Sequence, residues 1–170
     1  LTQARRVLQE DPNSPGAMIV AGMSLVGLDR IEPASRYLDE ALRLAPERAD
    51  VHYGLGALYR LNGNRHQAVK ELEVACRLAP TSWEPNEMLG KLLAERAEEF
   101  GSPRRLLERS QFHTVRALQL GPSVPTTGSL IQRLAMTCLQ TGRLDEAHKL
   151  FLRLRDVPDY ALKAKYFLGV

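Results

Sequence analysis

The fold is decided by residues 49–82, ADVHYGLGALYRLNGNRHQAVKELEVACRLAPTS. Its first half has apolar side chains at the spacing that lines one face of a helix: Val51, Leu55, Leu58 and Tyr59. Its second half repeats this pattern with Ala68, Leu72, Ala75 and Cys76. Gly63 can adopt the left-handed conformation that ends a helix, and Pro80 cannot continue one. The stretch therefore predicts a hairpin of two amphipathic helices.

The same residue types recur at a step of 34 positions along the chain. Small or rigid residues mark the step, in the series Gly22, Gly56, Gly90 and the series Pro12, Pro46, Pro80. A helix–turn–helix unit repeated at this period is typical of the tetratricopeptide repeat. The sequence resembles that family in its small-residue positions, at Gly56, Ala68, Ala75 and Pro80. The resemblance covers nearly the whole chain and implies an all-α, right-handed superhelical solenoid.

We expect one tetratricopeptide array over residues 1–170. We also expect it to be a fragment of a longer chain, because residue 1 is Leu and lies inside a helical pattern. Residues 1–14 hold the second helix of a truncated repeat, and residues 159–170 form a terminal helix or the start of the next repeat. The complete repeats are 15–48, 49–82, 83–124 and 125–158. Their expected helices lie near 16–28, 32–44, 50–61, 65–78, 84–100, 103–119, 128–140 and 144–155.

The third repeat, 83–124, is eight residues longer than its neighbours. The extra length lies between Gly90 and Ser110, which are 20 residues apart where Gly56 and Ala68 are 12 apart. Because the apolar stripe continues through this segment, we expect each helix of the hairpin to gain about one turn. Gly101, Ser102 and Pro103 then form the turn, and Phe100 packs at its tip. A longer linker, 123–127, leads into the fourth repeat.

Composition and charge exclude several classes of protein. The chain is 44% hydrophobic and 25% charged, with a formal net charge of +3, which is ordinary for a globular domain. Residues 15–80 carry equal numbers of acidic and basic side chains, so they present no nucleic-acid footprint. The longest uncharged run, 12–28, is shorter than the roughly 20 residues of a membrane span. The sequence does not indicate a compartment or an oligomeric state.

The sequence contains no catalytic or metal-binding constellation, and we expect no cofactor. The four histidines are dispersed, with no partner at the spacing of a metal site. Cys76 and Cys138 fall on predicted buried faces in different repeats, which favours packed thiols over a disulfide. Enzymatic activity is not expected of this segment, although such repeats can dock substrates for an enzyme domain elsewhere in a parent chain.

The resemblance implies a protein or peptide partner bound by the concave face, which the first helix of each repeat lines. The residues expected there are Ile19, Val20, Met23, Val26, Tyr53, Ala57, Arg60, Leu61, Glu87, Met88, Lys91, Glu95, Gln132, Arg133, Met136 and Gln140. The family's carboxylate clamp is not supported, because its Lys, Asn and Arg positions hold Ile19, Met23 and Gly54. The apolar helix 16–28 is either buried on both sides or a surface for a partner.

An RNA-binding array is the alternative interpretation. Pentatricopeptide repeats share the helical hairpin, and residues 141–151 suit that family as well. Base-reading repeats need polar side chains at one recurring groove position. The corresponding residues follow no such rule, being Ile19, Tyr53, Glu87 and Gln132. Nucleic acid is therefore not the expected partner.

Overall fold

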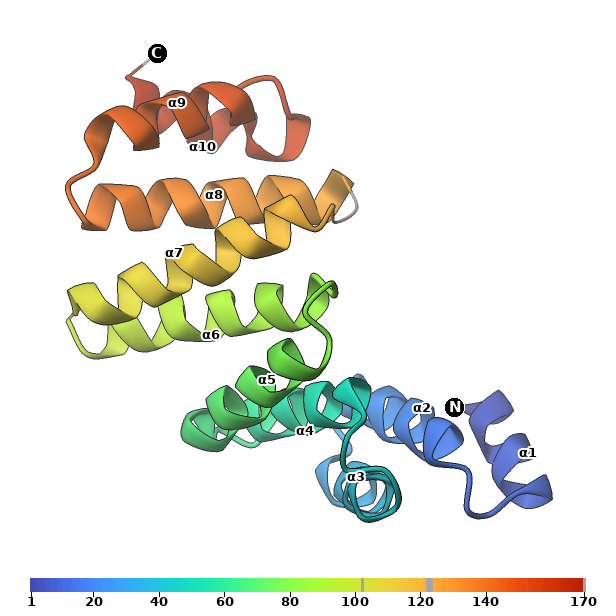
Figure 1. Ribbon diagram of the computed structural model, residues 1–170. Coiled ribbons are helices and arrows are strands. Elements are labelled where there is room, and N and C mark those ends of the chain that lie inside the picture. Colours follow the sequence, from blue (N-terminus) through green and yellow to red (C-terminus); the bar gives the residue numbers. More distant parts are fainter. Residues whose placement is uncertain (102, 122–123, 170) are drawn as a thin grey trace. The chain divides into compact units, whose positions relative to one another are not determined.

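The computed structural model describes residues 1–101, 103–121 and 124–169, without the side chains of 124 and 125, and all regular structure in them is helical. The chain divides into two compact units, Leu1–Pro80 and Thr81–Val170 (Figure 1). The first contains α1 (Thr2–Glu10), α2 (Pro15–Val26), α3 (Ile31–Leu44), α4 (Ala49–Leu61) and α5 (Arg65–Leu78). The second contains α6 (Glu84–Glu99), α7 (Arg104–Gln119), α8 (Val124–Gln140), α9 (Leu144–Leu154) and α10 (Pro158–Leu168).

The prediction of an all-α helical-repeat solenoid is confirmed. The largest difference is at α8, which begins at Val124, four residues before the predicted start. Residues 124–127 are therefore the first turn of this helix, where a proline such as Pro125 is tolerated because its missing N–H has no partner to lose. Ser102, which we expected in the turn of the third repeat, lies outside the described residues, as do Pro122 and Ser123 at the start of the expected linker.

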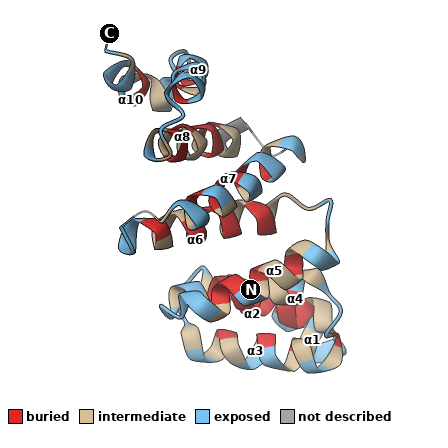
Figure 2. Cartoon of the chain, turned by 60° about the vertical axis from the view of Figure 1, so that its left-hand side comes forward, coloured by how far each residue is buried: buried red, intermediate tan, exposed pale blue. Residues whose placement is uncertain are grey.

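The Leu1–Pro80 unit is held by the apolar faces of its hairpins. Helix α2 packs against α1, α3 and α4, and α4 packs against α5. The core combines residues of α2, α3 and α4, namely Met18, Ile19, Leu25, Ala34, Leu38, Ala41, Val51, Leu55 and Leu58. Figure 2 shows α2 and α4 with more buried positions than α3, which buries only one stripe. The helix that is apolar all round is thus one that packs against three others, on more than one of its faces.

Close approach within these hairpins requires a residue without a Cβ. A Cβ on Gly22 would lie 2.7 Å from Leu38 Cγ, and a Cβ on Gly56 would lie 2.7 Å from Leu72 Cγ. Both leucines are completely buried. The identical contact recurs at the sequence step of 34, so the spacing of the glycines reflects a repeated helix crossing.

The side chain of His52 on α4 makes polar contacts with α5 and with the loop between the first two hairpins. The two ring nitrogens of His52 lie 2.7 Å from Glu71 Oε2 on α5 and 2.8 Å from the Pro46 carbonyl oxygen before α4. The side chain of His52 is only 12% exposed. The imidazole therefore packs against its neighbours and also makes polar contacts with two of them.

In the Thr81–Val170 unit, the α6–α7 hairpin is longer than α4–α5. Gly90 lies nine residues before the end of α6, whereas Gly56 lies five before the end of α4. Ser110 donates a hydrogen bond of 2.8 Å from its buried hydroxyl to the Gly90 carbonyl oxygen, which fixes the close crossing. The tip differs from expectation, since Phe100 is 66% exposed and adds little burial there.

The end of this unit has its own apolar cluster between α8, α9 and α10. Its buried members are Ile131, Ala135, Cys138, Ala147, Phe151, Leu154 and Ala164. The ring of Phe151 stacks on that of Phe167 with their centroids 4.7 Å apart. Tyr160 covers Gly128, where a Cβ would meet the Tyr160 ring at 2.5 Å. The first turns of α8 are therefore held against α10.

The close helix crossing at Gly56 predicts that even a substitution by alanine lowers the free energy of unfolding. Gly56→Ala places a methyl group 2.7 Å from Leu72 Cγ, and overpacking of this kind costs about 1–3 kcal/mol. Gly16→Ala is the matched control, because nothing lies within 4 Å of a Cβ there. Urea denaturation should show Gly56→Ala less stable than wild type and Gly16→Ala equal or slightly more stable. Equal stability of the two variants would contradict the close approach.

Candidate functional site

A cavity of about 300 Å³ lies between α6 and α8, inside the Thr81–Val170 unit. Each helix contributes one face to it, because the lining residues recur at intervals of three and four. The lining residues are Lys91, Ala94, Glu95, Glu98, Ser129, Gln132, Arg133, Met136, Thr137 and Gln140. Its volume is at the lower end of the range that ligand pockets usually have.

Several of the predicted groove residues meet in this cavity. They are Lys91, Glu95, Gln132, Arg133, Met136 and Gln140. Glu87 and Met88 lie outside the lining, although Glu87 contacts it through Arg133. Sequence reasoning missed Ala94, Glu98, Ser129 and Thr137. A helical register would have found them, since Glu98 follows Lys91 by seven residues, and Ser129 and Thr137 each lie four residues from Arg133.

Arg133, which we expected on the binding face, is mostly buried and is bound to other residues of the protein. Its side chain is 13% exposed, and it lies 3.4 Å from Glu87 Oε1. The guanidinium also donates to the Glu87 carbonyl oxygen at 3.3 Å and to Thr114 Oγ1 at 3.2 Å. Burial lowers the pKa of Arg133, while the Glu87 carboxylate acts in the opposite direction. Arg133 therefore joins α6, α7 and α8 beneath the cavity.

In the Leu1–Pro80 unit, the predicted groove residues divide by burial. Ile19 and Ala57 are 5% exposed, so they belong to the core and not to a surface. Ile19 is buried because three helices, α1, α3 and α4, pack around α2. The contacts of α2 with α1 and α4 cannot be inferred from the α2–α3 hairpin alone. Val20 is 54% exposed and Arg60 is exposed. The remaining predicted residues are half-buried, namely Met23, Val26, Tyr53 and Leu61.

A second polar contact lies between α7 and the turn before α9. The Gln111 side chain donates to Thr141 Oγ1 at 3.3 Å and accepts a hydrogen bond from Arg143. Gln111 is 7% exposed, and its amide also lies near Cys138 Sγ. Together with Arg133, this amide makes the junction between the α6–α7 and α8–α9 hairpins polar. The junction specifies one pairing of the hairpins, because each buried polar group needs its own partner.

A histidine completes the polar groups behind α6. His113 Nδ1 lies 3.0 Å from Asn86 Oδ1, and Asn86 donates to the Ser82 carbonyl oxygen at 3.2 Å. Burial and, to a smaller extent, the positive charge of Arg109 lower the pKa of His113 to about 4. His113 is thus neutral at pH 7 and donates one hydrogen bond to a buried amide.

The described residues offer no group of side chains arranged to hold a metal ion. Cys76 and Cys138 are free thiols. Burial raises the pKa of Cys76 to about 11 and also raises that of Cys138, which makes both unreactive at neutral pH. None of the described helices is long and apolar enough to cross a membrane.

Comparison with known proteins agrees with this geometry. Residues 19–82 match the family model described as a tetratricopeptide repeat. The chain is 33% identical over 142 residues to the TPR repeat-containing protein PA4299 of Pseudomonas aeruginosa, covering 83% of this chain. The chain spans about half the length of that relative, 54%.

Solved structures show the same fold. The chain is similar to YrrB, a TPR protein with an unusual peptide-binding site, with a TM-score of 0.77 and 22% identity over 98% of this chain and 80% of that one. It is similar to the human IFIT1 dimer with m7Gppp-AAAA, with a TM-score of 0.75 and 19% identity over 98% of this chain and 38% of that one. The fold is that of a helical-repeat scaffold. The chain belongs to the tetratricopeptide-repeat family.

The lowered pKa of His113 predicts a loss of stability in mild acid. The unfolded chain takes up a proton near pH 6.5 and the folded chain only near pH 4, so stability is complete above pH 6.5 and falls as the pH drops towards 4. His113→Gln keeps a donor for Asn86 but cannot be protonated. Thermal melts at pH 7 and pH 5 should show a loss smaller by about 1 kcal/mol in His113→Gln than in wild type, since the ring is partly solvated. An unchanged pH dependence would show that His113 titrates alike in both states.

Proposed function

We propose that this tetratricopeptide scaffold binds a peptide segment of a partner protein in the cavity between α6 and α8. One observation carries the proposal, namely that two successive first helices of the array each turn one face towards the same cavity. Tetratricopeptide repeats serve as protein-interaction scaffolds and are typically not enzymes. YrrB, which has the same fold, is described by its peptide-binding site.

The cavity combines the two kinds of group that peptides need. Met136 and Ala94 supply an apolar wall, and Met adapts its shape to different side chains. Gln132 and Gln140 add amides that can both donate to and accept from a peptide backbone. A mixed lining of this type suits an extended or helical segment with alternating apolar and polar side chains.

The Leu1–Pro80 unit supports the same function less well. In this unit the equivalent first helices are α2 and α4. Two of the residues expected on their binding face, Ile19 and Ala57, are buried in the core. What remains exposed is Val20 on α2 and Arg60 on α4. Isolated exposed apolar residues are normal on protein surfaces and do not indicate a site.

RNA is the competing ligand, because the human IFIT1 structures with the same fold contain capped RNA. Affinity for RNA depends on cations that neutralise phosphates. In the α6–α8 cavity Arg133 is already paired with Glu87, and two carboxylates, Glu95 and Glu98, line the wall. The two carboxylates outnumber Lys91, the remaining cation of the lining, and therefore disfavour phosphate, which favours a peptide.

Peptide selection tests the proposal with the complete 170-residue chain. Peptides enriched from a random display library are labelled, and their Kd is measured by fluorescence anisotropy. Met136→Asp should weaken binding at least tenfold, about 1.4 kcal/mol, because it places a charge in the apolar wall. Val20→Asp is the matched control, an exposed apolar residue in the other unit, and it should bind like wild type.

The two variants separate the possible outcomes. Loss of binding in Val20→Asp, with Met136→Asp unaffected, would move the site to α2 and contradict the proposal. Circular dichroism must show unchanged helical content in each variant, and Met136→Ala provides a milder truncation if Met136→Asp unfolds. Tight binding of a capped oligoribonucleotide that peptides do not displace would favour the RNA alternative.

A further inference from the structure

Some of the charged side chains that line the α6–α8 cavity form ion pairs within the protein, and others do not. Arg133, the most deeply placed cation, is held by Glu87 at 3.4 Å and by Thr114 at 3.2 Å. A guanidinium with these partners has little attraction left for a ligand carboxylate. Lys91 is exposed, and it lies seven residues before Glu98, about two helical turns away on the same face of α6. The end of the cavity at Glu98 therefore has no unpaired cation among its described lining residues.

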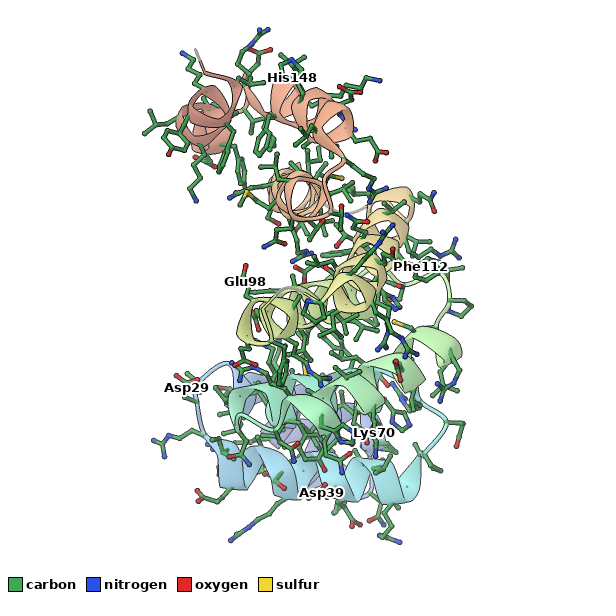
Figure 3. The ribbon with its side chains drawn as sticks, turned by 90° about the vertical axis from the view of Figure 1, so that its left-hand side faces the viewer. Asp29, Asp39, Lys70, Glu98, Phe112 and His148 are labelled. Carbon is green, nitrogen blue, oxygen red and sulfur yellow. The ribbon has the colours of Figure 1, made fainter. Side chains whose placement is uncertain are left out.

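The carboxylates of α6 are in the opposite situation. Glu95 and Glu98 are three residues apart and share the face that lines the cavity. Glu95 interacts with the charge of Arg133, whereas no ion pair is found for Glu98 among the described residues. Figure 3 shows Glu98 and Phe112 on opposite sides of the α6–α7 hairpin, so Glu98 projects on the cavity side. Glu98 thus offers an unpaired negative charge at the mouth.

An apolar wall lies beside this charge. Met136 and Ala94 line the same cavity, and Ala94 precedes Glu98 by one helical turn. A ligand cation near Glu98 therefore has an apolar surface within one turn of the helix. Long basic side chains suit such a site, because their methylene stems pack on apolar surface while the charged head reaches a carboxylate.

We infer that the cavity selects peptide segments in which a lysine or arginine stands next to an apolar residue. This inference rests on the proposed function and assigns the ligand class of the same site. The basic head is placed at Glu98, with Glu95 adding negative potential, and the apolar side chain packs on Met136. Charge complementarity of this kind contributes specificity and association rate more than affinity.

The sequences of the selected peptides give the first test. Peptides enriched against the wild-type chain should carry Lys or Arg beside Leu, Ile, Met or Phe. A selection against Glu98→Lys should lose the basic residue and gain Asp or Glu at that place. Glu47→Lys is the matched control, an exposed carboxylate in the loop before α4, and its selection should resemble that of wild type. Enrichment of acidic or uncharged peptides by wild type would overturn the inference.

Affinity measurements separate this inference from the proposed function. A basic peptide from the wild-type selection should bind Glu98→Lys at least tenfold more weakly and Glu98→Gln several-fold more weakly, and the loss should shrink at high salt. If Met136→Asp abolishes binding while Glu98→Lys leaves it unchanged, the cavity is the site but the ligand class is wrong. If Met136→Asp binds like wild type, both are wrong. Helical content monitors folding in every case.

Discussion

The close approach of two helices at a residue without a Cβ is the constraint on which the hairpins α2–α3, α4–α5 and α6–α7 depend. In α2–α3 and α4–α5 the glycine receives a buried leucine, Leu38 or Leu72, at the same 2.7 Å. This contact fixes where the helices cross and so which face of the first helix points away from its partner. The glycine step of 34 therefore determines more than stability, because it sets the direction of the side chains that are left for binding.

The α6–α7 hairpin keeps this crossing but changes its chemistry. Thr114 stands where α3 and α5 have Leu38 and Leu72, and a Cβ on Gly90 would meet its Oγ1 at 2.8 Å. The hydroxyl of Thr114 then accepts a hydrogen bond from Arg133, which Glu87 holds from α6. One exchange of leucine for threonine thus lets a cation enter the junction between hairpins. Because that cation is paired internally, we propose that the carboxylates lining the same cavity, Glu95 and Glu98, select the ligand.

The sequence predicted the helices well because periodicity, glycine and proline act locally. Nearly all helix ends lie within two residues of their expected positions. The start of α8 differs because Pro125 is equally compatible with a linker and with the first turn of a helix. The candidate site was predicted only in part. Lys91, Gln132 and Met136 follow from the helical register, whereas the burial of Ile19 depends on α1 and α4 together. Arg133 and Glu87 form a tertiary contact between residues 46 positions apart in the sequence, and no local sequence pattern predicts such a contact.

The four methionines of the chain provide the most direct measurement of where a peptide binds. Met18 and Met23 lie on α2, Met88 lies on α6 outside the lining, and Met136 lines the α6–α8 cavity. Methyl-labelled protein titrated with a selected peptide should show a large NMR shift for Met136 and none for Met18 or Met23. Shifts confined to Met18 and Met23, with Met136 unchanged, would contradict the account.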